Sequence, residues 1–184
     1  MKKILIILSL MIFSSNLIFA ENEDEKNNIQ VWFSAYVGTF ILNEKPENET
    51  NFLETGYIFN FQLNNHLFKL GYLRADNDPW SLFGESDDEY PYEKLKRLSL
   101  SYHHVILNFK LFQISLGIGL NRTSYQKIYY KNHNPEEKTA FGFSLEGEAM
   151  IKIFIFSSGI YAYYNQNSLK THAGYGAVLS FGWF

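Results

Sequence analysis

Apolar and polar side chains alternate with a period of two residues through most of this chain. Residues 53–63 show the alternation most clearly, and residues 112–121 repeat it. In the first segment one face is mainly apolar and aromatic and the other mainly polar or small, with Leu53, Thr55, Tyr57, Phe59, Phe61 and Leu63 opposed to Glu54, Gly56, Ile58, Asn60 and Gln62. Successive side chains of a β-strand point to opposite faces, so this period predicts strands and argues against helices.

Eight segments have this character, at residues 30–42, 53–63, 66–74, 95–107, 112–121, 139–149, 153–164 and 173–184. Each is near the roughly ten residues that a tilted membrane strand needs. Aromatic residues make up 18% of the chain, as expected when every second side chain faces lipid and the others face a polar interior. The pattern predicts an all-β protein, an eight-stranded antiparallel up-and-down transmembrane β-barrel.

The connections between these segments alternate between short and long. Tight turns are expected at residues 63–66, 107–110 and 150–152, and long polar loops at residues 43–51, 75–94, 122–138 and 165–172. Outer-membrane barrels have short periplasmic turns and longer extracellular loops. An even number of strands returns both ends to the periplasmic side and lets the sheet close, because lipid offers no partner to an open edge.

The N-terminal segment has the features of a cleaved export signal. Residues 1–20 contain Lys2 and Lys3, an apolar core, and Ala20 before the expected cleavage site. We expect residues 21–28 to form a periplasmic tail and residues 29–184 to form the barrel in the bacterial outer membrane. The chain has no cysteine, which excludes disulfides and thiolate chemistry. Its formal net charge of −3, without a basic stripe, argues against nucleic acid as a partner.

The last strand ends in aromatic residues, Phe181, Trp183 and Phe184. With the architecture of residues 29–184, this ending resembles the small eight-stranded outer-membrane proteins of the OmpA, OmpX and OmpW type. The resemblance implies that the C-terminal strand is the assembly signal read by the barrel assembly machinery. Phe184 is one residue out of phase with the lipid-facing positions, which are Tyr175, Ala177, Leu179, Phe181 and Trp183.

Polar residues on the predicted inward faces form a candidate site. Lys69, His103, Glu146, Glu148, Gln62 and Gln113 all lie within a few positions of the short-turn rim. A charged gate or proton-linked site is one interpretation. The interpretation we favour is a structural plug with Lys69 paired to Glu146 or Glu148, because the interior of an eight-stranded barrel is just wide enough to be filled by side chains.

Two predicted extracellular loops are candidate interaction surfaces. Loop 75–94 is acidic and carries Trp80, Phe83, Tyr90 and Tyr92, which suit contact with an extracellular partner. Its carboxylates raise the question of a divalent cation, although a solvated acidic loop is the simpler interpretation. Segment 122–138 is basic, and Arg122, Lys127 and Lys131 are positioned to contact lipopolysaccharide phosphates.

We therefore expect a non-enzymatic outer-membrane protein, without a cofactor or metal, that acts through its extracellular loops in surface interaction or envelope integrity. The alternative is a narrow pore for ions or small apolar molecules, since inward glycines leave room that Trp32, Tyr36 and Tyr161 would refill. A lipid-modifying envelope hydrolase is weaker, because Ser101 and His103 share an inward face without an orienting acid. A soluble lipocalin-like barrel with its apolar face inward shows the same alternation.

Overall fold

The computed structural model describes residues 29–42, 52–76, 92–128, 136–169 and 171–184. The predicted signal, the tail, loop 43–51 and most of loop 75–94 lie outside the described residues, as do Trp80, Phe83, Tyr90 and Lys131. Among the residues described, no helix has the length and apolar character needed to cross a membrane.

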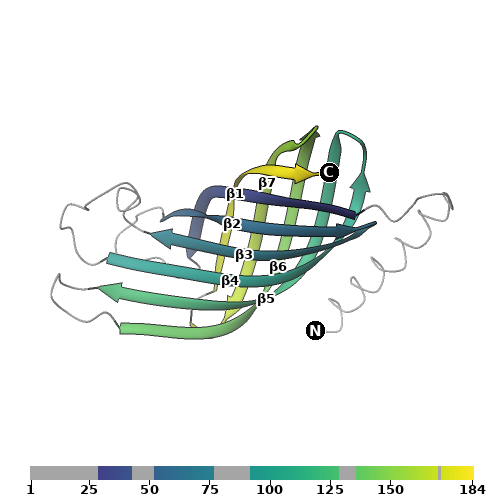
Figure 1. Ribbon diagram of the computed structural model, residues 1–184. Coiled ribbons are helices and arrows are strands. Elements are labelled where there is room, and N and C mark those ends of the chain that lie inside the picture. Colours follow the sequence, from purple (N-terminus) through teal and green to yellow (C-terminus); the bar gives the residue numbers. More distant parts are fainter. Residues whose placement is uncertain (1–28, 43–51, 77–91, 129–135, 170) are drawn as a thin grey trace, which may run out of the picture.

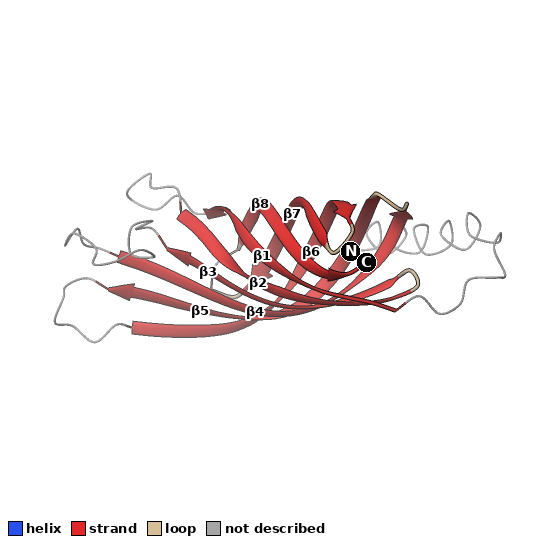
Figure 2. Ribbon diagram, turned by 45° about the horizontal axis from the view of Figure 1, so that its top comes forward, coloured by secondary structure: helices blue, strands red, loops and turns tan. Residues whose placement is uncertain are grey.

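Eight strands form a closed antiparallel barrel in which each strand pairs with its neighbours in the chain and β1 pairs with β8 (Figure 1). They are β1 (Ile29–Leu42), β2 (Phe52–Leu63), β3 (His66–Asp76), β4 (Tyr92–Asn108), β5 (Phe112–Ile128), β6 (Glu136–Ile153), β7 (Phe156–Asn167) and β8 (His172–Trp183). The predicted fold class and strand count are confirmed. Figure 2 shows strands as the only regular secondary structure of the described residues.

The prediction of a tight turn at residues 150–152 was wrong. β6 continues to Ile153, and the turn consists of Phe154 and Ile155. Lys152 still points into the barrel and is buried. Both faces of this stretch are largely apolar or small, so the alternation has no clear break from which to locate the turn.

Both predicted boundaries of the long loop at residues 122–138 were wrong. β5 runs on to Ile128 and β6 begins at Glu136, with Lys127 opposite Glu136 and Arg122 opposite Phe141. Strands β4, β5 and β6 have 17, 17 and 18 residues, whereas β7 and β8 have 12 each. Side chains beyond an apolar belt are polar on both faces, so the hydrophobic alternation stops while strand pairing continues.

The polarity of the barrel is inverted relative to a soluble protein. The outward positions carry large exposed apolar side chains, among them Phe33, Phe59, Leu70, Leu100, Ile118, Phe143, Leu179 and Phe181. The inward positions carry buried polar side chains, among them Asn60, Lys69, Arg97, His103, Asn121, Glu146 and Asn165. This arrangement rules out a lipocalin-like barrel with an apolar lining, because it turns the apolar face outward.

Inward glycines make room for large neighbouring side chains. A Cβ atom on Gly117 would lie 2.3 Å from Cδ2 of His103, and one on Gly174 would lie 2.5 Å from Cε1 of Tyr163. Each glycine therefore receives a ring from an adjacent strand. The room that the glycines leave is refilled, and it does not form a channel at these two positions.

Candidate functional site

The predicted inward polar residues are buried together in the half of the barrel that ends at the short turns. Nζ of Lys69 on β3 lies 2.5 Å from Oε2 of Glu148 on β6, and both side chains are almost fully shielded from solvent. On the same strand as Glu148, Glu146 accepts from Nε2 of His103 at 3.1 Å. The register of β6 thus gives Lys69 and His103 separate carboxylate partners.

Smaller side chains complete this cluster. Ser144 donates a hydrogen bond of 2.7 Å to the other oxygen of Glu146, and Oγ of Ser115 lies 3.3 Å from Nδ1 of His103. Gln62 donates to the carbonyl of Asn64 at 2.6 Å. Gln113 is buried, and neither atom of its amide has a hydrogen-bond partner among the described residues. The structure does not join the two glutamines to the charged pairs through a hydrogen bond between described side chains.

A second charged network, which the sequence analysis missed, lies further from the short turns, nearer the end of the barrel with the long loops. The guanidinium carbon of Arg97 lies 3.4 Å from the ring centroid of Tyr163, and Nη2 of Arg97 is 3.4 Å from the hydroxyl of Tyr161. The hydroxyl of Tyr163 donates to Oε1 of Glu54 at 2.6 Å. Extending the inward parity of Ser99, Ser101 and His103 by two residues along β4 identifies Arg97 as an inward residue.

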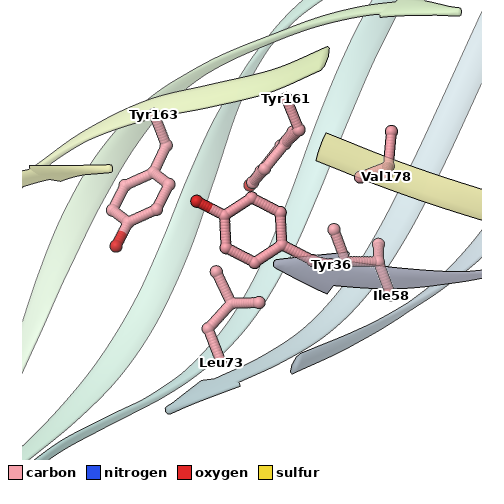
Figure 3. Close-up of a cluster of buried hydrophobic side chains, with 6 residues drawn as sticks. All are labelled: Tyr36, Ile58, Leu73, Tyr161, Tyr163 and Val178. Atoms are coloured by element: carbon pink, nitrogen blue, oxygen red, sulfur yellow. The ribbon is translucent and has the colours of Figure 1, made fainter. Parts of the chain in front are cut away.

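Clusters of apolar and aromatic side chains lie along the barrel beside these charged networks, and Tyr161 contacts both Lys69 and Arg97. Tyr36, Ile58, Leu73, Tyr161, Tyr163 and Val178 meet in the middle, where the tyrosine rings and aliphatic side chains converge on the barrel interior (Figure 3). Trp32, Leu67, Val105 and Met150 pack near the short turns, and Phe40, Phe52, Ala75 and Leu95 near the opposite end. Polar and apolar side chains together fill the interior, as expected for eight strands.

The C-terminal aromatic residues divide between the two faces. Phe181 and Trp183 point outward and are exposed. Phe184 follows β8 and packs inward, with its ring centroid 5.2 Å from that of Trp32 and 5.9 Å from Nζ of Lys152. Lys152 also donates to Gln30 at 3.3 Å and to Asn108 at 3.1 Å. Phe184 thus covers the mouth of the barrel at the short-turn end.

The arrangement around His103 has the connectivity of a Ser–His–acid triad but lacks the access that catalysis requires. Ser115 and Glu146 lie on the two nitrogens of His103, whereas Ser101, the serine considered from the sequence, makes no hydrogen bond to described groups through its hydroxyl. All of these side chains are buried in the lumen. A nucleophile must reach its substrate and an oxyanion site, so this cluster has the geometry of a packed core.

Cationic side chains gather on the outer face of the β3–β5 sheet, beyond the apolar belt. Arg74 and Lys96 are opposite each other across β3 and β4, and Arg122 on β5 is opposite Leu98. Lys94 lies one outward position further along β4. We call these four residues, Arg74, Lys94, Lys96 and Arg122, the outer basic face. Only Arg122 among them was a predicted site residue.

Lys127, another residue of the predicted basic segment, does not share this face, because it lies at an inward position, 3.4 Å from Oε1 of Glu93. Tyr92, which was predicted as part of loop 75–94, is the first residue of β4.

Two acidic residues lie beside the outer basic face. Asp76 accepts from Arg74 at 2.9 Å. Glu137 on β6 accepts hydrogen bonds from Ser124 and Gln126, and these bonds, with the nearby charges of Lys96 and Arg122, hold the pKa of the carboxyl group below its usual value. The formal charge of the four cations and two acids is 4 − 2 = +2, counted over the strand residues described. No group of three or more metal-ligating side chains occurs within these described strands and turns.

A closed eight-stranded barrel with an apolar exterior and a packed polar interior defines the fold class of small outer-membrane barrels. Neisserial surface protein A has a similar structure, with 11% sequence identity and a TM-score of 0.62, covering 85% of this chain and 99% of that chain. Ail, the attachment invasion locus protein of Yersinia pestis, matches with 8% identity and a TM-score of 0.57, over 87% of this chain and 100% of that chain.

The N-terminal β-barrel domain of Pseudomonas aeruginosa OprF is a third similar structure, with 10% identity and a TM-score of 0.55 over 85% of this chain and 100% of that chain. The sequence itself matches no protein-family model and no curated protein. At these identities the comparisons establish the fold.

Proposed function

We propose that this protein is a non-enzymatic outer-membrane barrel that acts through its extracellular end, in surface interaction or envelope integrity. The observation that carries the proposal is the inverted polarity of the barrel. Leu70 and Leu100 point outward beside each other, while their neighbours along the same strands, Lys69 and Ser101, are buried inside. Exposing so much apolar surface is favourable in lipid and unfavourable in water.

Filling of the lumen favours a closed barrel over a narrow pore. Trp32, Tyr36 and Tyr161 are at most 3% exposed, and the buried Lys69–Glu148 and His103–Glu146 pairs occupy the space between the apolar layers. The same burial argues against a hydrolase. We therefore expect binding to take place at the ends of the barrel and on its outer surface, and not in the lumen.

The outer basic face supports contact with lipopolysaccharide. Arg74 and Lys96 lie directly opposite each other, and an anion bound beside such like-charged cross-strand neighbours reduces their repulsion. Asp76 already pairs with Arg74, so we expect Lys96 and Arg122 to make the main contact. The apolar residues Leu98 and Phe141 lie next to Arg122, so an acyl chain and a phosphate on one lipid reach both surfaces together. Ail has been solved in complex with sucrose octasulfate, a polyanionic heparin analogue, and a polyanion is the same ligand chemistry that we propose for this chain.

The exposed pair Phe181 and Trp183 is the part of the predicted assembly signal that remains available to the barrel assembly machinery. Phe184 is packed against Trp32 in the finished barrel. We infer that the assembly machinery recognises Phe184 before this packing forms.

Membrane fractionation combined with gel mobility tests the proposal. The protein is extracted from isolated outer membranes and run with and without boiling. We expect an outer-membrane location and a faster-migrating unboiled form, because a closed barrel resists unfolding by detergent. A soluble protein without a mobility shift would overturn the proposal. Single-channel recording of the same material should stay silent, and a steady conductance would replace the closed barrel with the pore.

A further inference from the structure

The turns between β6 and β7 and between β2 and β3 have a similar backbone conformation but different residue types. Phe154 has a φ of 56° and Asn64 has a φ of 53°, and each is the first of two turn residues. Asparagine tolerates this left-handed conformation, whereas a bulky aromatic residue rarely adopts it. The chain therefore places Phe154 in a conformation that is unfavourable for its side chain.

Burial within the protein does not account for Phe154. Its side chain is 93% exposed, and Ile155 beside it is 44% exposed. Phe109 and Leu111, in the adjacent turn, are each 63% exposed. The amide of Lys152, near the end of β6, donates a hydrogen bond of 2.9 Å to the carbonyl of Leu111 in the adjacent turn. An apolar patch therefore lies at the end of the barrel.

Charged side chains are few in this region. Lys152, the only charged residue from Ile151 to Asn165, points into the lumen and is 4% exposed. Lys110 lies in the adjacent turn. Its long, flexible side chain lets the ammonium group reach water even where the backbone of the turn lies at the membrane surface. The β2–β3 turn has the two polar residues Asn64 and Asn65 instead. The two turns therefore suit different surroundings.

The apolar patch continues the outer belt. Ile151, Ile153 and Phe156 are exposed outward residues that lead to the turn, and the ring of Phe156 lies 5.5 Å from that of Phe181 on β8. The amide of Gly182 donates to the carbonyl of Ile155 at 2.9 Å. The turn is therefore level with Trp183, and tryptophan is enriched at the membrane–water interface.

We propose that the β6–β7 turn, with Phe154 and Ile155 at its tip, inserts into the inner leaflet of the outer membrane and anchors the periplasmic end of the barrel there. The proposal rests on the proposed function, since it requires a barrel in lipid. The apolar patch contacts the lipid of that leaflet, because the patch is continuous with the apolar outer belt of the barrel. A periplasmic protein partner would instead need the turn to stand in water.

The chain has no cysteine, so single-cysteine variants report the depth of each turn directly. Phe154→Cys and Ile155→Cys probe the apolar turn, Asn65→Cys is the matched control in the polar turn, and Leu179→Cys marks the belt. Each variant carries a small fluorophore and is refolded in vesicles of phosphatidylethanolamine and phosphatidylglycerol. Folding of every variant is checked by gel mobility. If one of the two variants in the apolar turn fails to fold, the other still reports the depth of that turn.

Quenching by lipids that carry a nitroxide near the headgroup end of the acyl chain is compared with quenching by aqueous iodide. We expect lipid quenching at Phe154→Cys and Ile155→Cys to be at least twofold greater than at Asn65→Cys, with iodide in the reverse order. Equal quenching of the two turns by iodide, with Leu179→Cys quenched by lipid, would overturn the anchor and leave the proposed function standing. Loss of lipid quenching at Leu179→Cys would overturn both.

Discussion

Lys69 and Glu148 form a buried ion pair across the lumen, with Nζ and Oε2 2.5 Å apart. The Lys69 ammonium group also lies 5.1 Å from the ring centroid of Tyr161. The second carboxylate oxygen of Glu148 has no hydrogen-bond partner among the described residues. The pair thus depends on one close contact between two side chains that are almost fully shielded from solvent.

We predict that Lys69→Met destabilises the barrel by about 3–5 kcal/mol, because it leaves the Glu148 carboxylate buried without its cation. The measurement is urea unfolding in phospholipid vesicles, followed by gel mobility. The double variant Lys69→Met/Glu148→Leu should recover most of the loss, since an apolar pair of similar volume needs no charge compensation. An unchanged unfolding midpoint for the single variant would show that the pair contributes little.

Gly174→Ala should destabilise the barrel by about 1–3 kcal/mol through overpacking. The added methyl group would lie 2.5 to 2.7 Å from three atoms of the Tyr163 side chain, which Arg97 and Glu54 hold in place. Gly147→Ala is the matched control, because its nearest neighbour is the flexible end of Leu116 at 3.1 Å. The same unfolding measurement applies, and equal stability of the two variants would contradict tight packing at Gly174.

Replacing Lys96 and Arg122 by serine should weaken binding of labelled lipopolysaccharide roughly tenfold or more, given about 1 kcal/mol for each cation near an anionic surface. Binding of lipopolysaccharide to the wild type should also weaken with added salt. Lys127→Ser is the control, because Lys127 lies at an inward position beside Glu93. If the control and the double variant bind equally, the outer basic face is not the contact.

Phe184→Ala should lower the free energy of unfolding by about 1–2 kcal/mol, because a half-buried aromatic side chain leaves the Trp32 cluster. Conductance should remain absent, since Trp32, Leu67 and Met150 stay in the lumen. Trp183→Ala, which removes an outward side chain, is the comparison. A channel that opens in Phe184→Ala would assign Phe184 a gating role in place of a packing role.

Much of the fold was predictable because period-two alternation indicates the number of strands and the face of each residue, and the short connections indicate that neighbouring strands are antiparallel. The pattern from Phe112 to Leu120 required no knowledge of the rest of the chain. It also placed Lys69, His103, Glu146 and Glu148 on inward faces, where the structure has them. Alternation did not locate the strand ends where both faces share one polarity. This occurs at Lys127, beyond the apolar belt, and at Phe154 and Ile155, in the β6–β7 turn.

The sequence by itself determined an eight-stranded closed sheet, because side-chain alternation and loop lengths are local properties. Only the tertiary structure decided that Lys69 pairs with Glu148 while His103 pairs with Glu146, that Arg97 lies against Tyr163, and that Phe184 turns inward onto Trp32. Glu146 and Glu148 lie on the same face, two residues apart, so alternation does not distinguish between them. The tilt and stagger with which the strands close the barrel bring one of them opposite each base.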